Sequence, residues 1–305
     1  MNNNFNLSQE QNIREVQKKG IILAGGSGKR LLPVTKSISK HLIPLYDKPM
    51  IYYPLSTLML ADTKEILLIT TKKDKDRFFD LFGNGHHLGI NINYKIEEKP
   101  LGVNQAFILG EEFIGKDPVT LILGDNFFHG SELINKLLNS YVTNGAKIFI
   151  HPVKDPSSYG VIEIDKYKRV ISIEEKPKVP KSKYAITGLY FFDNSVIEKS
   201  KRCTFSERGE LEILDLLKLY LEEKKLKVEI LGRGNAWLDT GTWESLLEAS
   251  SFIRSIENRQ GYKIGCPEEI AWRKGWINSK DLIKLSENYK ENEYKNYLQD
   301  IANQS

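Results

Sequence analysis

The feature that most constrains the chain is a glycine-rich loop, Gly25-Gly26-Ser27-Gly28, placed directly after the apolar segment Ile21 to Ala24. Glycine allows positive φ and close backbone approach, so such a loop can wrap its N–H groups around phosphates. A Walker A loop would need Gly at Leu23 and Ser or Thr at Arg30, and the chain has neither. A dinucleotide fingerprint would need a small residue at Leu31. We therefore expect a phosphate-binding loop of another class.

Short β-branched runs alternate with helical spacing from Lys19 onward. Strands separated by helices of this length predict right-handed βαβ units and a parallel, doubly wound α/β sheet. The predicted strands are Ile21 to Ala24, Glu65 to Thr70, Ile92 to Ile96, Val119 to Leu123 and Lys147 to His151. The predicted helices between them are Pro49 to Ala61, Asp74 to Phe82, Gly102 to Phe113 and Ser131 to Thr143.

After Val153 the pattern changes to closely spaced strands, which predict a β-rich insertion that makes the sheet mixed. Predicted there are strands Tyr159 to Ile164, Val170 to Glu174, Tyr184 to Phe192 and Val228 to Leu231, helices Asn194 to Lys201, Glu210 to Lys224 and Thr242 to Asn258, and a turn-like segment Ala236 to Gly241. The end reads as a helical appendage. We divide the chain into a disordered N-terminal extension (1–18), a main domain (19–258, with parts 19–153 and 154–241) and the appendage (259–305).

Composition excludes several classes of protein. The 44 basic residues nearly balance 40 acidic ones, which gives no reason to expect a nucleic-acid partner. Only Cys203 and Cys266 are present, without metal-ligand spacing, so neither a disulfide framework nor a zinc site is predicted. The polar first residues lack the apolar region of a secretory signal, and no apolar run reaches the ~18 residues of a membrane helix. We expect a soluble, cytoplasmic protein.

Charged residues follow the loop and two of the strands. Arg30 and Lys40 are suited to neutralise phosphate charge. Asp125 comes after the strand Val119 to Leu123, and Asp239 after Ala236-Trp237-Leu238. Carboxylates at such strand ends are suited to hold Mg²⁺ with phosphate oxygens, although aspartates there also serve as helix caps or turn formers. No Ser-His-Asp or Cys-His constellation is evident, so a covalent intermediate is not required.

Several motifs together resemble the sugar nucleotidylyltransferase superfamily, and within it the branch that acts on dTTP and glucose 1-phosphate. The resemblance covers essentially everything after residue 18. It is carried by the loop with Arg30 and Lys40, and by Tyr46-Asp47-Lys48-Pro49-Met50, Leu123-Gly124-Asp125-Asn126, Glu174-Glu175-Lys176-Pro177, Thr187-Gly188-Leu189-Tyr190, Arg208-Gly209-Glu210 and Trp237-Leu238-Asp239-Thr240-Gly241.

The resemblance implies a Rossmann-like core, with the nucleotide bound by 19–153 and the sugar by 154–241. It implies the reaction of dTTP with α-D-glucose 1-phosphate to dTDP-glucose and pyrophosphate, an early step toward deoxysugars such as rhamnose for surface polysaccharides, in a homotetramer. The catalytic residues would be Arg30, Lys40 and Lys176, and the Mg²⁺ ligands Asp125 and Asp239. The nucleotide-binding residues would be Leu23, Gly25, Gly26, Ser27, Gly28, Lys29, His41, Glu97 and Gly102. The sugar-binding residues would be Asn126, Tyr159, Gly160, Glu175, Ile186, Tyr190 and Trp237.

Two residues depart from the pattern in the base pocket: His41 and Glu97 stand where the superfamily usually has Gln. A Gln amide offers a donor and an acceptor to thymine, whereas an ionised Glu only accepts. CTP, UTP or a purine triphosphate therefore remain alternatives to dTTP. A further departure is Lys29 in place of Thr. A non-catalytic nucleotide-sugar sensor is also open, but it is disfavoured because the charged residues named above are all present.

Overall fold

A computed structural model describes residues 16–304 of the protein, and its central strand is β1 (Lys19–Ala24). β1 lies between β4 (Glu65–Thr70) and β6 (Val119–Leu123), parallel to both, with Ile21 opposite Leu67 and Leu121. Successive side chains of a strand point to opposite faces of a sheet. Ile22 accordingly packs into one hydrophobic cluster and Ile21 into another. The uninterrupted apolar sequence of β1 is thus explained by burial on both faces.

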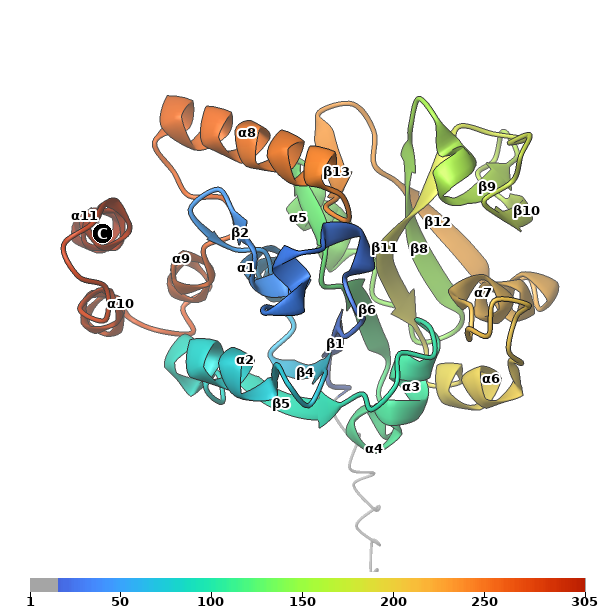
Figure 1. Cartoon of the computed structure of the whole chain (residues 1–305), viewed down its shortest axis with the longest axis horizontal. Helices are drawn as coiled ribbons and strands as arrows, with labels where there is room; N and C mark the ends of the chain where they lie inside the picture. The colour runs from blue at the N-terminus through green and yellow to red at the C-terminus, as the bar shows by residue number, and fades with distance from the viewer. Residues whose placement is uncertain (1–15, 305) are drawn as a thin grey trace, which may run out of the picture.

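The main sheet has nine strands, in the order β10-β9-β11-β6-β1-β4-β5, with β8 paired to β11 and β12 (Figure 1). β5, β4, β1 and β6 run parallel, whereas β11 is antiparallel to β6, β8 and β9. The remaining strands of this sheet are β5 (Asn91–Ile96), β8 (Ala146–Pro152), β9 (Gly160–Ile164), β10 (Val170–Glu175), β11 (Tyr184–Phe192) and β12 (Leu226–Ile230). The expected mixed α/β sheet is confirmed.

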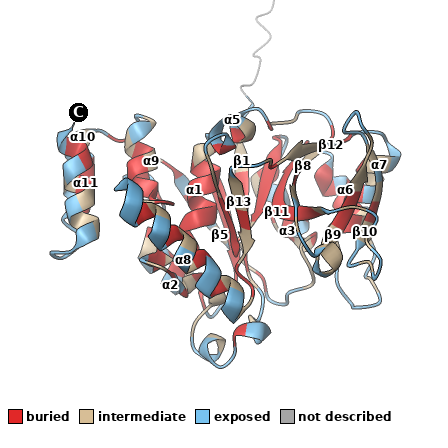
Figure 2. Ribbon diagram, turned by 90° about the horizontal axis from the view of Figure 1, so that it is seen from above, coloured by how far each residue is buried: buried red, intermediate tan, exposed pale blue. Residues whose placement is uncertain are grey.

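Helices cover both faces of the sheet, and their inner sides are buried (Figure 2). The α-helices are α1 (Tyr52–Leu60), α2 (Lys75–Phe82), α3 (Gln105–Leu109), α4 (Glu111–Ile114), α5 (Leu133–Leu138), α6 (Val196–Arg202), α7 (Ile213–Glu222), α8 (Trp243–Gln260), α9 (Pro267–Arg273), α10 (Ser279–Ser286) and α11 (Glu293–Asn303). Short 3-10 turns are η1 (Lys29–Leu31), η2 (Val34–Lys36), η3 (Lys40–Leu42), η4 (His86–Leu88) and η5 (Pro156–Ser158). Within residues 16–304, none of the helices combines the length and apolarity needed to cross a membrane.

One sequence-based expectation is wrong. The segment Ala236 to Gly241 is not simply a turn: most of it belongs to strand β13 (Asn235–Asp239), which pairs antiparallel with β7 (Asn126–Gly130). A separate hairpin is formed by β2 (Pro44–Leu45) and β3 (Lys48–Pro49). The β7–β13 pairing joins segments more than a hundred residues apart, which local patterns do not reveal. Residues 1–15 of the predicted disordered extension lie outside the described residues.

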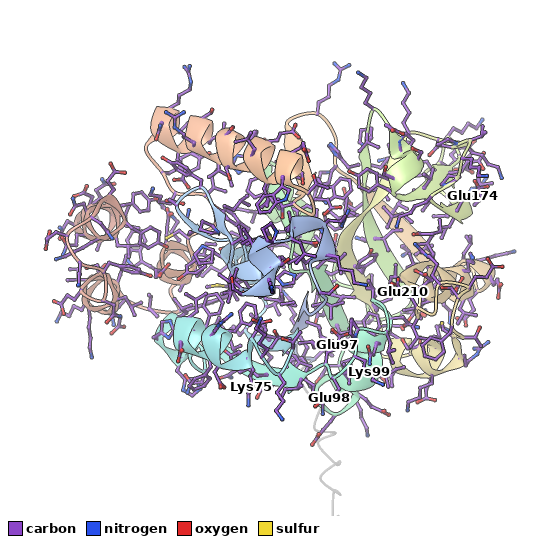
Figure 3. All side chains as sticks on the ribbon, viewed as in Figure 1. Lys75, Glu97, Glu98, Lys99, Glu174 and Glu210 are labelled. Atoms are coloured by element: carbon purple, nitrogen blue, oxygen red, sulfur yellow. The ribbon has the colours of Figure 1, made fainter. Side chains whose placement is uncertain are left out.

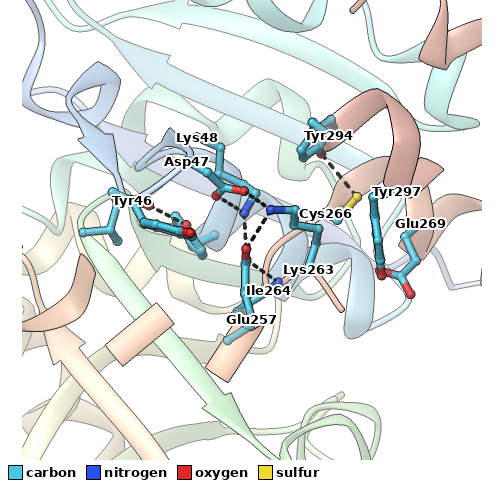
Figure 4. Close-up of polar contacts among 12 residues, drawn as sticks. Tyr46, Asp47, Lys48, Glu257, Lys263, Ile264, Cys266, Glu269, Tyr294 and Tyr297 are labelled. Atoms are coloured by element: carbon cyan, nitrogen blue, oxygen red, sulfur yellow. Dashed lines mark hydrogen bonds and ion pairs between the residues drawn. The ribbon is translucent and has the colours of Figure 1, made fainter. Parts of the chain in front are cut away.

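A buried cluster of charges attaches α8 to the β2–β3 hairpin and to the segment that leads into α9 (Figure 4). The Glu257 carboxylate on α8 accepts hydrogen bonds from Lys48 Nζ at 3.1 Å, Lys263 Nζ at 3.0 Å and the Ile264 N–H at 2.8 Å. Asp47 supplies a second carboxylate to both lysines. Glu257 and Lys48 are 5% and 4% exposed. Because the charges are buried but matched, each depends on its partners.

Replacing Glu257 by Gln is expected to lower the free energy of unfolding by about 3–5 kcal/mol, because two lysine ammonium groups lose a buried counter-charge. The matched control is Glu291→Gln, which breaks an exposed i,i+4 pair with Lys295 and is expected to cost less than about 1 kcal/mol. Chemical denaturation of both variants measures the difference. Equal effects of the two substitutions would contradict a structural role for the buried cluster.

Candidate active site

The glycine-rich loop leaves the carboxyl end of β1 and turns into η1. Gly26 and Gly28 have φ of 90° and 57°, which favour glycine. The Thr35 hydroxyl donates to the Gly28 carbonyl at 2.9 Å and fixes the end of the loop. At Gly25 the requirement is steric, since a Cβ atom there would lie 1.8 Å from Glu97 Oε2. The loop is therefore shaped both by its own φ angles and by a carboxyl group from the end of β5.

Two adjoining hollows lie around the loop and share Gly26 and Lys40. The first is lined by Leu23, Gly25, Gly26, Lys40, His41, Glu97, Pro100, Gly102, Val103, Leu123, Asp125, Glu210 and Glu212. The second is lined by Gly26, Ser27, Gly28, Lys29, Arg30, Leu31, Lys40 and Gly241. All nine residues predicted to bind the nucleotide thus line one hollow or the other. Cations predominate in the second hollow, and carboxyl groups are more numerous in the first.

Lys40, Asp125, Asp239 and Arg30 meet where the two hollows join. The Lys40 ammonium contacts Asp125 Oδ2. Burial alone would raise the pKa of Asp125, but the charge and hydrogen bond of Lys40, together with His41 and the Asn126 amide, outweigh it and hold that pKa well below its usual range. The pKa of Asp239 is raised by burial and by the charge of Asp125. The Arg30 guanidinium lies against Gly241, where a Cβ would be 2.6 Å from Nη2.

His41 and Glu97 are both buried, at 1% and 4% exposure. His41 Nδ1 lies 3.2 Å from Ser39 Oγ, and its Nε2 edge faces Gly124. Burial and the neighbouring Lys40 lower the pKa of His41 to about 3, so the ring is neutral at physiological pH. Burial raises the pKa of Glu97 to about 7. Of the two residues that depart from the superfamily pattern, His41 is therefore neutral, and Glu97 retains its proton in about half of the molecules near pH 7.

Asn126 connects the nucleotide hollow with the β-rich part of the domain. Its Oδ1 accepts from the Trp237 indole N–H at 2.6 Å and from the Gly188 N–H at 3.0 Å, and its Nδ2 donates to Asp125 at 3.1 Å. Both lone pairs of Oδ1 are used, which leaves Asn126 one amide hydrogen for a ligand. Trp237 in turn packs on Tyr159, with ring centroids 5.2 Å apart. The predicted sugar residues Asn126, Tyr159 and Trp237 are thus brought together.

The other predicted sugar residues lie on β9, β10 and β11. Gly160 faces Ile186, and the pKa of Tyr190 is raised by burial and by the charges of Glu175 and Asp125. Lys176 follows β10 with φ of 42°, and its Nζ lies 3.5 Å from Glu175 Oε1.

Sequence reasoning assigned no role to the segment that carries Arg208. Its guanidinium donates to Glu175 at 3.1 Å and to Glu212 at 2.8 Å. Leu211 closes over Gly102, where a Cβ would lie 2.5 Å from the Leu211 carbonyl oxygen. The motif Arg208-Gly209-Glu210 contributed to the resemblance to the superfamily, but its position beside the nucleotide hollow depends on long-range contacts.

Comparisons with known proteins identify the family of the chain. A family model described as nucleotidyl transferase matches residues 19–256. Glucose-1-phosphate thymidylyltransferase of Neisseria meningitidis is 53% identical over 281 residues, covering 92% of this chain and 98% of that protein. The enzyme of the same name from Mycobacterium tuberculosis is 50% identical over 283 residues, covering 93% and 98%.

Solved structures give the same result. A crystal structure from Bacillus anthracis, described as a glucose-1-phosphate thymidylyltransferase in complex with sucrose, superposes with a TM-score of 0.72 at 39% identity, covering 78% of this chain and 96% of that one. A UDP-glucose pyrophosphorylase complexed with UDP-glucose superposes with a TM-score of 0.70 at 24% identity and supports the fold alone.

Replacing Gly25 by Ala is expected to weaken nucleoside triphosphate binding roughly ten- to hundredfold, because the new methyl group displaces the Glu97 carboxyl from the hollow. The control is Gly232→Ala, a position with no atom within 4 Å of the added Cβ. Titration calorimetry measures the binding, and thermal unfolding checks that both variants fold. Unchanged affinity in the folded Gly25→Ala variant would contradict the packing of Glu97 on the loop.

Proposed function

The chain belongs to the nucleotidyl transferase family, and we propose that it transfers a thymidylyl group from dTTP to glucose 1-phosphate, giving dTDP-glucose and pyrophosphate. The observation that carries the proposal is identity of 50% or more to glucose-1-phosphate thymidylyltransferases over more than nine tenths of both chains. Formation of dTDP-glucose is an early step of deoxysugar synthesis. Rhamnose and surface polysaccharides as the end products remain part of the proposal.

We assign the triphosphate to the cationic hollow and the base to the hollow that contains Glu97. Backbone N–H groups of the loop, with Lys29 and Arg30, would hold the phosphates. Leu23 and Gly102 would lie against the base and ribose. The predominance of cations in the second hollow supports this orientation, because cations attract a triphosphate.

In the proposed reaction an oxygen of the sugar phosphate attacks the α-phosphorus of dTTP. The bond from that phosphorus to the oxygen bridging to the β-phosphate breaks, and pyrophosphate leaves. The attacking oxygen is already charged, so no strong general base is needed. The obstacle is repulsion between two anions, and Arg30, Lys40 and Lys176 are suited to reduce it by neutralising charge and aligning the reactants.

The family typically uses Mg²⁺, and the residues at the junction of the hollows fit that ion. No group of three or more His, Cys, Asp or Glu with metal-site geometry occurs among residues 16–304, but Mg²⁺ is often held by one or two carboxylates together with substrate phosphates and water. Asp125 and Asp239 would be these ligands, since burial and the charge of Asp125 raise the pKa of Asp239, and a cation would relieve the repulsion between the two carboxylates. Bound Mg²⁺ would supply further neutralisation of phosphate charge.

We propose that the sugar binds across β9, β10 and β11, beside Asn126 and Trp237. Glu175 would accept hydrogen bonds from sugar hydroxyl groups, and Lys176 would pair with the sugar phosphate. Two contacts support this arrangement: Arg208 holds the Glu175 carboxylate, and the Lys176 N–H donates to the Tyr159 carbonyl at 3.0 Å. Gly160, Ile186 and Tyr190 would line the same pocket.

Pyrophosphate release measured with dTTP, UTP, CTP, ATP and GTP, each with glucose 1-phosphate, tests the function. We expect turnover with dTTP, loss of turnover when a chelator removes Mg²⁺, and recovery on adding Mg²⁺ back. A preference for CTP or a purine triphosphate would refute the choice of base while keeping the chemistry. If the folded protein released pyrophosphate from none of these triphosphates, the result would favour the nucleotide-sugar sensor.

Replacing Lys176 by Ala is expected to lower kcat/KM for glucose 1-phosphate about a hundredfold or more, because a charged group that pairs with the sugar phosphate is lost. The control is Lys178→Ala, an exposed lysine two residues further, expected to change kcat/KM by less than about twofold. Steady-state kinetics at saturating dTTP measures both. Similar losses in the two variants would argue for general surface charge instead of a specific contact.

We further propose that the chain works as a homotetramer in the cytoplasm. The exposed apolar side chains Trp243 and Leu247 on α8, 41% and 70% exposed, are candidates for a subunit contact. Both cysteines are free, as expected of a protein in a reducing compartment. Light scattering of the purified protein gives the mass that tests the assembly. The division into 19–258 and 259–305 likewise stays a proposal.

A further inference from the structure

Glu97 occupies an unusual position for a carboxyl group. It follows β5 directly, its backbone N–H donates to the Thr70 carbonyl at 2.8 Å, and its side chain is directed over the Cα atom of Gly25. Only 4% of the residue is exposed. The small exposed part faces the hollow lined by Leu23, Gly102 and Val103. The carboxyl group is therefore largely shielded from solvent, at the place assigned to the nucleobase.

No ion pair or hydrogen bond to the Glu97 carboxyl is formed anywhere in residues 16–304. The charged or titratable groups around the same hollow are Lys40 and His41 on η3, Asp125 after β6, and Glu210 and Glu212 before α7. Glu98 and Lys99 follow along the chain and are exposed (Figure 3). Of these, Lys40 is engaged by Asp125, His41 is neutral, and Glu212 is engaged by Arg208. Nothing nearby compensates a negative charge on Glu97.

The protonation state of Glu97 decides which base it suits. An ionised carboxylate only accepts, so it matches the amino group of cytosine but not the adjoining carbonyl oxygen and N–H of thymine or uracil. A neutral carboxylic acid carries one donor and one acceptor side by side. It can donate to the carbonyl oxygen of thymine and accept from the thymine N3–H. The neutral form thus offers the same pair of groups as a glutamine amide.

We propose that Glu97 binds the base as a neutral carboxylic acid, and that this protonation is what allows dTTP to bind, whereas the ionised form favours CTP. The inference rests on the function proposed above and specifies its nucleotide. It also resolves the conflict between Glu97 and a thymine base noted in the sequence, because burial supplies the missing donor. In this view the residue is a specificity determinant whose preference shifts toward CTP when the proton is lost.

A pH dependence follows from the position of Glu97. Burial raises its pKa to about 7 in the free protein, so the neutral form predominates below that pH and falls about tenfold for each further pH unit above it. Affinity for dTTP is therefore expected to decline relative to affinity for CTP as pH rises through about 7. Above about pH 7, binding of dTTP should take up a proton, and binding of CTP should take up fewer protons.

Titration calorimetry of the full chain with dTTP and with CTP, between about pH 6.5 and 8.5, tests the inference. The ratio of dTTP to CTP affinity is expected to fall at least roughly twentyfold over this range, as the neutral fraction of a group with a pKa of about 7 does. Ionisation of the triphosphate itself is common to both ligands and cancels in the ratio. Repeating the titrations in two buffers of different ionisation enthalpy gives the number of protons taken up.

Glu97→Gln is the matched variant, because the amide has the same shape and keeps a donor and an acceptor at every pH. Its dTTP-to-CTP ratio is expected to be independent of pH, and its dTTP binding to take up about one proton fewer than the wild type near pH 8.5. If the variant does not fold, the pH dependence of the wild-type dTTP-to-CTP affinity ratio and the wild-type proton uptake are sufficient to test the inference. A pH-independent ratio in the wild type, with dTTP bound and turned over, would overturn the inference and leave the function intact. If the folded protein turned over none of the triphosphates, that result would instead overturn the proposed function, and this inference with it.

Discussion

The contact between the Lys40 ammonium and the Asp125 carboxylate is the interaction on which the geometry of the site depends. Asp125 stands at the carboxyl end of β6, and Lys40 is on the turn that follows the glycine-rich loop. The backbone carbonyl of Asp125 also accepts from the Thr240 N–H at 3.0 Å and the Thr240 hydroxyl at 2.7 Å. One residue thereby positions the lysine, the end of β13 and, through Asn126, the edge of the β-rich part. Displacement of Asp125 would separate all three.

Charge is distributed unevenly along the two hollows, and the distribution is consistent with the proposed chemistry. Lys29, Arg30 and Lys40 surround the end that would receive phosphates. Glu97, Glu210 and Glu212 line the adjoining hollow. A group that is buried without a counter-charge tends to give up its charge. Glu97 follows this rule, and the residue that looked unsuited to a thymine base in the sequence becomes compatible with one in the folded chain.

Much of the fold could be predicted because its signals are local. The parallel strands of the first half have apolar runs and the glycine loop has its own φ requirement, so both are evident from neighbouring residues. The β7–β13 pairing was missed, since the segment around Trp237 is short and its partner lies more than a hundred residues away. The role of Arg208 was missed for the same reason. Its partners Glu175 and Glu212 are brought to it only by packing of 206–212 against 101–104.

By itself, the sequence determined the class of chemistry. Phosphate transfer requires a glycine-rich loop, cations such as Arg30 and Lys40 after it, and aspartates after buried strands. All of these groups can be identified in order along the chain. Tertiary structure decided how those groups are charged. The pKa of Glu97 is raised by burial, and that of Asp239 by burial and by the charge of Asp125. Both effects depend on residues that are far away in the sequence. A one-dimensional pattern specifies the residue type, but only three-dimensional surroundings set its proton affinity.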